Sequence, residues 1–467
     1  MRCKLDFCIK KNNLILLVLG IAFICLLFFF MFAEFDQAER VILPILFSLI
    51  IASYLVAVLN IFNSDKFVPK IYLISVLVHF CFILFWQILK YYILGLPMPT
   101  DTNFTPFISD ADGVMYHQIS SFLADNYNLA FLSDKYYGGF FPKLIATLYH
   151  IFGKNPFIAT CMNSVVASFV SVLVFLISKK VLKDRNLCKI YALLCVFCTS
   201  FIVNTSVLMR DGYITLFMYL SIYLSYKVHK TGNIIYIIFL LLSIYSLYLF
   251  RPYAAIMVIL GIVFGSIFKH IRIKKVKRGI RANKTGIIFL AFLPFIILGL
   301  VFGLGWFISN QTLLHNELSV ESLINLRETA YAVSNSTYSW DFNKLYHIFP
   351  LLPFLIGYLC LFFAPFPTEW IYVKRLHFVP DMLVLYCLLP SFIKNLKLIF
   401  KDKNYYLLVC FFTMICMFSI YCITVGNSGT IHRLRGPYIP MIYLIAMYRP
   451  DKFLSRILNK IQKWRLV

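Results

Sequence analysis

The chain has 467 residues, of which 61% are hydrophobic and only 14% are charged, and its mean hydropathy is +0.81. This composition excludes a soluble globular protein and predicts an all-α polytopic membrane protein, because helices satisfy their own backbone hydrogen bonds in lipid. The net charge of +24 does not indicate a nucleic-acid partner. The basic residues lie in short segments between apolar runs, as the positive-inside rule expects of a protein surrounded by membrane lipids.

Apolar runs long enough to cross a hydrocarbon core of about 30 Å recur along the whole chain. We therefore predict a single integral membrane domain over residues 1–467, with about 12–13 transmembrane helices. The predicted spans are 14–33, 41–62, 71–96, 157–178, 190–207, 212–227, 234–250, 253–268, 285–308, 349–366, 381–399, 406–425 and 437–449. The first of these is too long for the apolar region of a signal peptide, so we expect it to be retained.

Basic connections between the apolar runs predict the cytoplasmic side of the membrane. They are 179–189, 227–230, 269–284, 394–403 and the tail from Arg449. The loops 97–156 and 309–348, which hold most of the loop carboxylates, are then expected outside. Segment 349–366 contains several prolines, and a re-entrant path for it would return the basic tail to the inside.

The first external loop carries a dense group of polar side chains. Asp110 and Asp112 are followed by Tyr116 and His117. A carboxylate can take the proton from an acceptor hydroxyl as it attacks a sugar carbon, and a second one can bind sugar hydroxyls. Two close aspartates permit a divalent metal without requiring it, and no other cofactor is indicated. The alternative is that they are solvated residues at the N-terminus of an amphipathic helix.

Arginines mark the ends of two later spans. Arg210 and Asp211 lie between two apolar runs, and Arg251 follows another. Such charges are costly in lipid and are expected to face protein or water. Arg210 and Arg251 are candidates for binding a phosphate, since guanidinium donors match two oxygens at once, and Asp211 would orient them. The alternative for Arg210 and Asp211 is a local ion pair that closes a short turn.

A glycine-containing segment near the end of the chain, GNSGTIHRLR at 426–435, repeats this pattern. Arg433 and Arg435 place two cations on the side that we predict to be external, against the local charge trend. Arginines beside flexible backbone favour anion binding over a plain membrane anchor. Residues 136–153 are too short and polar for a span and predict a helix on the external surface.

The order of these features resembles that of the bacterial GT-C glycosyltransferases, in particular glycosyltransferase family 39, the dolichyl-phosphate-mannose mannosyltransferase-like proteins. The resemblance rests on the segment Asp110–Tyr116, on YYGGFFPKLIATLYHIFGKNPFIATCMNS (136–164) and on SVLMRDGYITLFMYLSIYL (206–224). The later FRPY (250–253), APFP (364–367) and GNSGTIHRLR segments are similar to features of a bacterial subgroup.

The resemblance implies a GT-C-like helix bundle with external amphipathic loop helices and an active site on the periplasmic face of the bacterial inner membrane. It implies a polyprenyl-phosphate-linked sugar donor, a lipid or glycan acceptor, and inversion at the anomeric carbon. Family members carry an acidic residue four positions before a Tyr in the first large outer loop, and Asp112 stands there relative to Tyr116. Asp112 would then be the general base, Asp110 its supporting carboxylate, and Tyr116 and His117 substrate contacts.

Two other classes of membrane protein remain open at this stage. A polysaccharide repeat-unit polymerase is also polytopic with external arginines, and it would use lipid-pyrophosphate oligosaccharides. A flippase for lipid-linked sugars would show paired half-repeats and charges near the membrane midplane, and the sequence has neither feature. If the protein is instead a glycosyltransferase, the arginines would bind the donor phosphate and stabilise the negative charge that develops on it.

Overall fold

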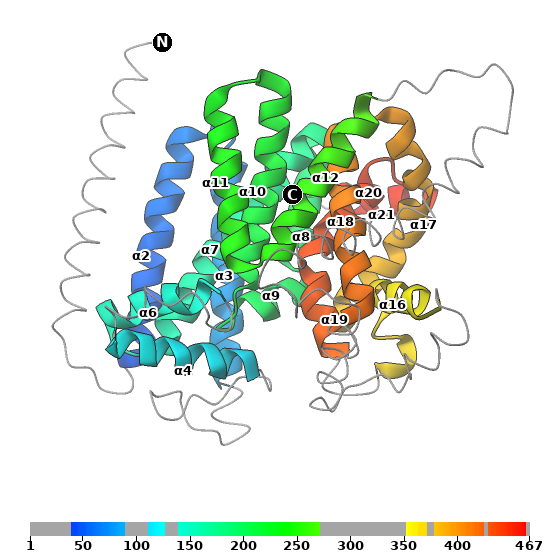
Figure 1. Ribbon diagram of the computed structural model, residues 1–467. Coiled ribbons are helices and arrows are strands. Elements are labelled where there is room, and N and C mark those ends of the chain that lie inside the picture. Colours follow the sequence, from blue (N-terminus) through cyan, green and yellow to red (C-terminus); the bar gives the residue numbers. More distant parts are fainter. Residues whose placement is uncertain are drawn as a thin grey trace, which may run out of the picture. The chain divides into compact units, whose positions relative to one another are not determined.

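The computed structural model describes residues 39–88, 111–126, 139–270, 352–370, 378–424 and 428–463. All regular structure in this part of the chain is helical, as composition predicts (Figure 1). The chain divides into two compact units, one up to Ala255 and the other from Ile256. The spans predicted at 14–33 and 285–308 and the loop at 309–348 lie outside the described residues.

The first unit is an antiparallel helical bundle with three short helices at one end. Its helices are α2 (Glu39–Phe62), α3 (Phe67–Ile88), α4 (Ala111–Asp125), α6 (Phe141–Phe152), α7 (Pro156–Val181), α8 (Arg185–Val196), α9 (Thr199–Thr205), α10 (Asp211–Thr231), α11 (Ile234–Phe250) and the start of α12 (Pro252–His270). Helix α7 is the centre of this unit, since it packs against α2, α3, α8 and α10. Helices α4 and α6 form a hairpin that contacts α7 (Figure 1).

The second unit contains the rest of α12 and the helices of the C-terminal part of the chain. They are α16 (Leu352–Phe363), η2 (Pro367–Glu369), α17 (Val379–Asp402), α18 (Tyr405–Thr424), α19 (Ser428–Arg435), η4 (Gly436–Tyr438), α20 (Ile439–Met447) and α21 (Lys452–Lys463). Small residues allow close packing here, because a Cβ on Gly265 would lie only 3.0 Å from the Cα of Val409. Helix α12 therefore approaches α18 backbone to backbone.

Six of the described helices are long and apolar enough to cross a membrane. They are Leu43–Phe62, Phe67–Phe85, Pro156–Val181, Pro252–His270, Val379–Asp402 and Tyr405–Cys422. The expected span at 190–207 is instead the pair α8 and α9, bent by 50°, which would make a seventh span if it crosses as one unit. Helix α11 is apolar but has 17 residues, and α16 ends shortly before the cis Ala364–Pro365 bond.

Large apolar side chains cover the outside of α11. Ile238, Phe239, Leu242 and Tyr245 are each more than half exposed. Exposing such a surface to water costs free energy, whereas exposing it to lipid tails does not. Together with the six apolar helices, this surface defines the molecule as a multi-pass membrane protein.

The two ends of the first unit differ in charge. The turns between α2 and α3, between α7 and α8, and between α10 and α11 lie at one end, which we call the basic end. Its basic residues are Lys66, Lys70, Lys179, Lys180, Lys183, Arg185, Lys189, Lys227 and Lys230. Helices α4, α6 and α9 lie at the opposite end (Figure 1).

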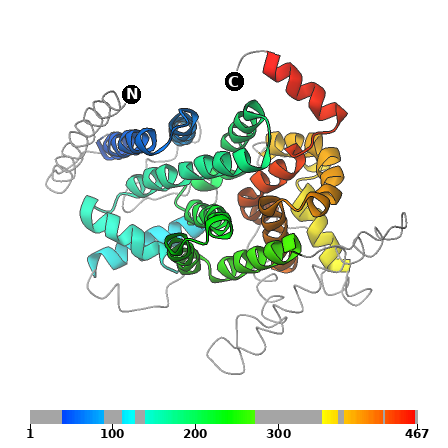
Figure 2. The same cartoon turned by 90° about the horizontal axis from the view of Figure 1, so that it is seen from above.

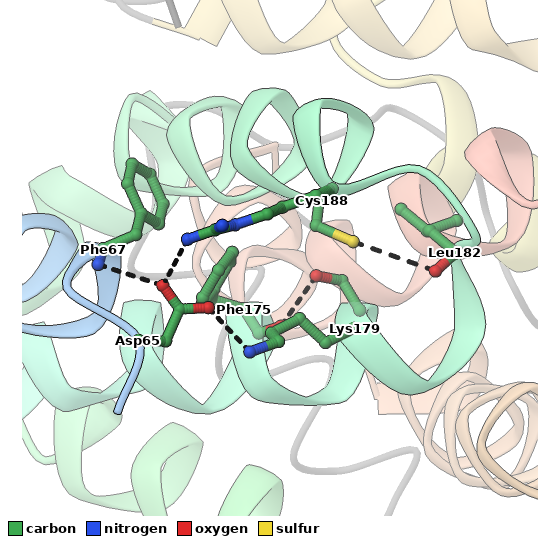
Figure 3. Close-up of polar contacts among 8 residues, drawn as sticks. Asp65, Phe67, Phe175, Lys179, Leu182 and Cys188 are labelled. Atoms are coloured by element: carbon green, nitrogen blue, oxygen red, sulfur yellow. Dashed lines mark hydrogen bonds and ion pairs between the residues drawn. The ribbon is translucent and has the colours of Figure 1, made fainter. Parts of the chain in front are cut away.

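An ion-pair cluster joins two of the turns at the basic end. Asp65 pairs with Lys179 at 2.6 Å and with Arg185 at 2.9 Å, and it accepts a hydrogen bond from the Phe67 amide (Figure 3). Partial burial acts to raise the pKa of Asp65, but the Lys179 hydrogen bond, the Phe67 amide and the nearby charges outweigh it. The pKa of Asp65 is therefore below its usual range.

Candidate functional site

Helix α4 carries the candidate base. Asp112 lies in its first turn and is half-buried, and Asp110 lies outside the described residues. Tyr116 follows one turn later on the same side of the helix, is fully buried, and meets the ring of Phe141 edge-on at 5.1 Å. The packing of Tyr116 therefore fixes the part of α4 that presents Asp112.

The two predicted substrate contacts lie between helices. His117 Nδ1 is 2.8 Å from the Tyr149 hydroxyl, and both side chains are buried. The Ser120 hydroxyl donates to the Pro142 carbonyl at 3.1 Å, so this side of α4 is held against α6. Tyr116 and His117 thus pack α4 against α6, and their contact with a substrate stays a prediction.

An aromatic bridge, which we define as Tyr116, Phe141, Tyr213 and Phe250, connects α4 to the ends of α10 and α11. The Phe141 and Tyr213 ring centroids lie 5.9 Å apart. Tyr213 stacks on Phe250 at 5.0 Å with an interplanar angle of 13°. Such aromatic contacts add stability beyond the apolar area that they bury. The bridge holds the α4 helix in a fixed relation to the arginine-bearing ends of α10 and α11.

A close backbone contact fixes α6 at the same place. The Phe140 amide donates to the Leu249 carbonyl at 3.1 Å. Gly139 has a φ of +66°, and a Cβ there would lie 2.7 Å from the Leu249 oxygen. Only glycine accommodates both this backbone conformation and this approach. Gly139 therefore permits the junction between α6 and α11.

Arg210, Asp211 and Arg251, which we call the arginine cluster, meet at the start of α10 and the end of α11. Arg251 Nη2 lies 3.5 Å from Asp211 Oδ1, and these side chains are only 5% and 2% exposed. Arg210 Nη1 donates to the Phe250 carbonyl at 3.0 Å, and Arg210 is half-buried. The Arg251 guanidinium also lies 5.6 Å from the centre of the Tyr253 ring. The cluster carries two cations and one anion, which leaves a net positive charge.

One donor of the cluster is shielded from solvent. Arg210 Nε has no hydrogen-bond partner among the described residues. Leaving a buried donor unpaired costs roughly 1–3 kcal/mol, and a bound anion can satisfy it. Asp211 lies in the first turn of α10, where a negative charge also interacts favourably with the helix dipole.

The turn before the arginine cluster is held by a residue that the sequence did not single out. The Asn163 amide nitrogen donates to the carbonyls of Val207 and Met209, at 2.8 and 2.7 Å. A Cβ on Gly212 would lie 3.1 Å from Asn163 Oδ1, so glycine lets α10 start close to α7. An asparagine inside an otherwise apolar run was the available signal, because such a side chain needs partners in a membrane span.

The second unit contains the other two candidate arginines. Arg435 is fully buried, and its Nη1 lies 2.7 Å from the Ala364 carbonyl and 3.3 Å from those of Leu361 and Phe362. Its Nη2 lies 2.9 Å from His432 Nδ1. These bonds satisfy carbonyls at the end of α16, so we assign Arg435 to capping this helix instead of phosphate binding. Arg433 is half-buried on α19, and its phosphate contact stays a prediction.

The described residues contain no group of three or more His, Cys, Asp or Glu side chains arranged to hold a metal ion. Neither a scan against protein-family models nor a search of the curated proteins finds a match for this chain. The class that the fold defines is therefore the all-α multi-pass membrane protein. In the first unit of this protein, the aromatic bridge links the helix that carries Asp112 to the arginine cluster.

Proposed function

We propose that this protein is an inverting membrane glycosyltransferase of the bacterial inner membrane. It would transfer a sugar from a polyprenyl-phosphate donor to a lipid- or polysaccharide-linked acceptor, with Asp112 as the general base. The observation that carries this proposal is the aromatic bridge, which joins the helix of Asp112 to the arginine cluster. A base and a phosphate site must be held in a fixed relation for such a transfer.

The chemistry needs one base and one anion site. The acceptor hydroxyl oxygen would attack the anomeric carbon, while its proton passes to the Asp112 carboxylate. The bond between this carbon and the phosphate oxygen would break, and its electron pair would leave with the polyprenyl phosphate. Arg210 and Arg251 would stabilise the charge that develops on the phosphate. Asp211 would keep the Arg251 guanidinium in position through their ion pair.

The charge distribution supports a periplasmic location of the site. The basic end of the first unit carries nine Lys and Arg residues in or beside three turns, and the arginine cluster lies at the opposite end. Basic turns face the cytoplasm in most multi-pass proteins. A polyprenyl-phosphate donor presented on the outer side of the membrane would then meet the arginine cluster.

Substitution of Asp112 by asparagine tests the role of the base. We expect Asp112→Asn to lower the rate of sugar transfer by at least about 100-fold, as the loss of a general base does. The measurement is sugar transfer by the purified protein in proteoliposomes with a polyprenyl-phosphate donor. Asp125→Asn is the matched control, because Asp125 lies on the same helix, is exposed and pairs with Lys154. Full activity of Asp112→Asn would reject the proposal.

The donor distinguishes this proposal from a repeat-unit polymerase. The same proteoliposomes can be given either a lipid-linked sugar monophosphate or a lipid-linked oligosaccharide pyrophosphate. We expect turnover with the monophosphate alone. Turnover with only the pyrophosphate would favour the polymerase, and movement of labelled lipid across the bilayer without sugar transfer would favour a flippase.

A further inference from the structure

Helix α21 at the C-terminal end of the second unit is a short amphipathic helix with several basic residues. Leu454 and Leu458 are buried, whereas Phe453 is 55% exposed. Lys452, Arg456 and Lys460 are exposed. At 100° per residue, Phe453 and Ile457 fall between the buried leucines and the basic side chains. The helix thus has three sides. One side packs against the protein, one is apolar and faces outward, and one is basic.

The direction of α21 is fixed by polar bonds between its start and α17. Asp451 Oδ1 accepts hydrogen bonds from the Leu454 amide and the Ser391 hydroxyl, both at 2.9 Å. The Asp451 amide donates back to Ser391 Oγ at 2.8 Å. The pKa of Asp451 lies below its usual range despite partial burial. The hydrogen bond from the Leu454 amide lowers it most, and the Ser391 hydroxyl and the charge of Lys394 lower it further. Asp451 is therefore an ionised N-cap that ties α21 to α17.

Two more residues of α17 hold the chain just before this point. The Asn395 amide donates to the carbonyls of Ile445 and Ala446 at 2.8 and 2.9 Å. Asp402 pairs with Arg449 at 2.7 Å. Residues in the C-terminal half of α17 thus hold the turn between α20 and α21, and this fixes the direction in which α21 leaves the turn.

This direction lies across the other helices of the second unit. Figure 2 looks along the bundle and shows α21, in red, lengthwise at the edge of the unit, whereas α18 is seen end-on. Helix α18 is one of the six helices that can cross a membrane. A helix that runs across the membrane spans instead of along them can lie in the plane of the bilayer.

The charge beside α21 identifies the surface that it meets. Lys394, Lys397, Lys401 and Lys403 lie on or directly after the C-terminal half of α17, beside the turn that leads to α21. A strongly basic end of a membrane bundle faces the cytoplasmic leaflet, which carries anionic lipid. Basic side chains flanking an exposed apolar side are the pattern of helices that bind such a surface.

We propose that α21 lies in the headgroup region of the cytoplasmic leaflet and binds anionic lipid. Phe453 and Ile457 would insert beside the bundle, while Lys452, Arg456 and Lys460 would contact lipid phosphates. Each basic residue near an anionic surface strengthens binding about fivefold. This inference does not depend on the proposed sugar transfer.

Amide hydrogen exchange over residues 452–463 tests this proposal on the full-length protein in nanodiscs. We expect exchange to be at least about fivefold slower with phosphatidylglycerol present than with phosphatidylcholine alone, and high salt should remove this difference. The triple variant Lys452→Gln, Arg456→Gln, Lys460→Gln should show equal exchange in both lipids.

The matched control is Lys66→Gln, Lys70→Gln, Lys230→Gln, which removes the same charge from exposed positions in the first unit and should keep the lipid dependence of α21. Equal exchange of the wild-type protein in both lipids would overturn the proposal, as would a lipid dependence that survives in the α21 triple variant. Because the lipid and salt comparisons use the wild-type protein, the test stands even if a variant fails to fold.

Discussion

Each end of the first unit has an aspartate that lies near two basic residues, but the two aspartates are in opposite surroundings. At the basic end, Asp65 is 10% exposed and its partners Lys179 and Arg185 are 36% and 63% exposed, with separations of 2.6 and 2.9 Å. At the other end, Asp211 and Arg251 are nearly inaccessible and lie 3.5 Å apart. The shorter ion pairs are thus the more solvated ones.

The difference shows that distance alone does not decide what an ion pair contributes. Exposed pairs contribute roughly 0–1 kcal/mol, because water and salt already stabilise each charge. In a buried pair each charge depends on the other, since the desolvation cost of an unpaired ion is several kcal/mol. A buried ion pair is weak evidence for stability, and buried charges cluster at functional sites, so the arginine cluster is the better candidate for function.

The largest effect is expected from breaking the buried pair. Arg251→Met leaves the Asp211 carboxylate buried without its cation, and we expect a loss of about 3–5 kcal/mol in the free energy of unfolding. The double variant Arg251→Met, Asp211→Asn should recover much of this loss. Reversible unfolding in mixed micelles measures both variants. If the stability of the single variant is unchanged, water reaches Asp211, and the ion pairs at the two ends are equally solvated.

A smaller effect is expected where α6 joins α11. Gly139→Ala should destabilise the protein by more than the roughly 1–2 kcal/mol that a left-handed conformation costs, because its Cβ would also meet the Leu249 carbonyl. Gly232 is the matched control, since it is left-handed with a φ of +61° and nothing lies within 4 Å of a Cβ there. The difference in melting temperature between the two alanine variants measures the contact alone. Equal losses would show that α6 and α11 are not held together here.

The smallest effect is expected at the basic end. Asp65→Asn should cost no more than about 1 kcal/mol at neutral pH. Because the pKa of Asp65 is lowered in the folded protein, its contribution is present above the usual carboxyl pKa of about 4 and is lost as the pH falls through the folded value. Wild type and variant should therefore converge in stability at acidic pH. A difference that persists there would contradict the assigned ion pairs.

The long apolar runs made the helices predictable, and those at 157–178, 381–399 and 406–425 coincide with α7, α17 and α18. The break between α8 and α9 was not predictable, because the run 190–207 is apolar on both sides of it. Cys198 adopts an extended conformation there, with φ −66° and ψ 106°. Hydrophobicity indicates that a segment is buried but not where its axis bends.

The candidate site was predictable only in part, for a similar reason. Composition showed that Arg251 needs a partner, but that partner, Asp211, is 40 residues earlier in the chain, and no local pattern connects them. The resemblance implied that His117 contacts a substrate, but the sequence could not show the hydrogen bond that His117 shares with Tyr149 of α6. Partners that come from other helices decide whether a polar residue is available to a ligand.

The most direct test of the central claim compares how the two ends bind the donor phosphate. The measurement is the Kd of polyprenyl phosphate for the wild-type protein, Arg210→Gln and Arg185→Gln in the same detergent, with melting temperatures to confirm folding. We expect Arg210→Gln to weaken binding by about 10- to 100-fold, which is the value of charge-assisted hydrogen bonds, and Arg185→Gln to bind as the wild type does. Unchanged binding by a folded Arg210→Gln protein, or an equal loss in both variants, would contradict the assignment of the arginine cluster as the phosphate site.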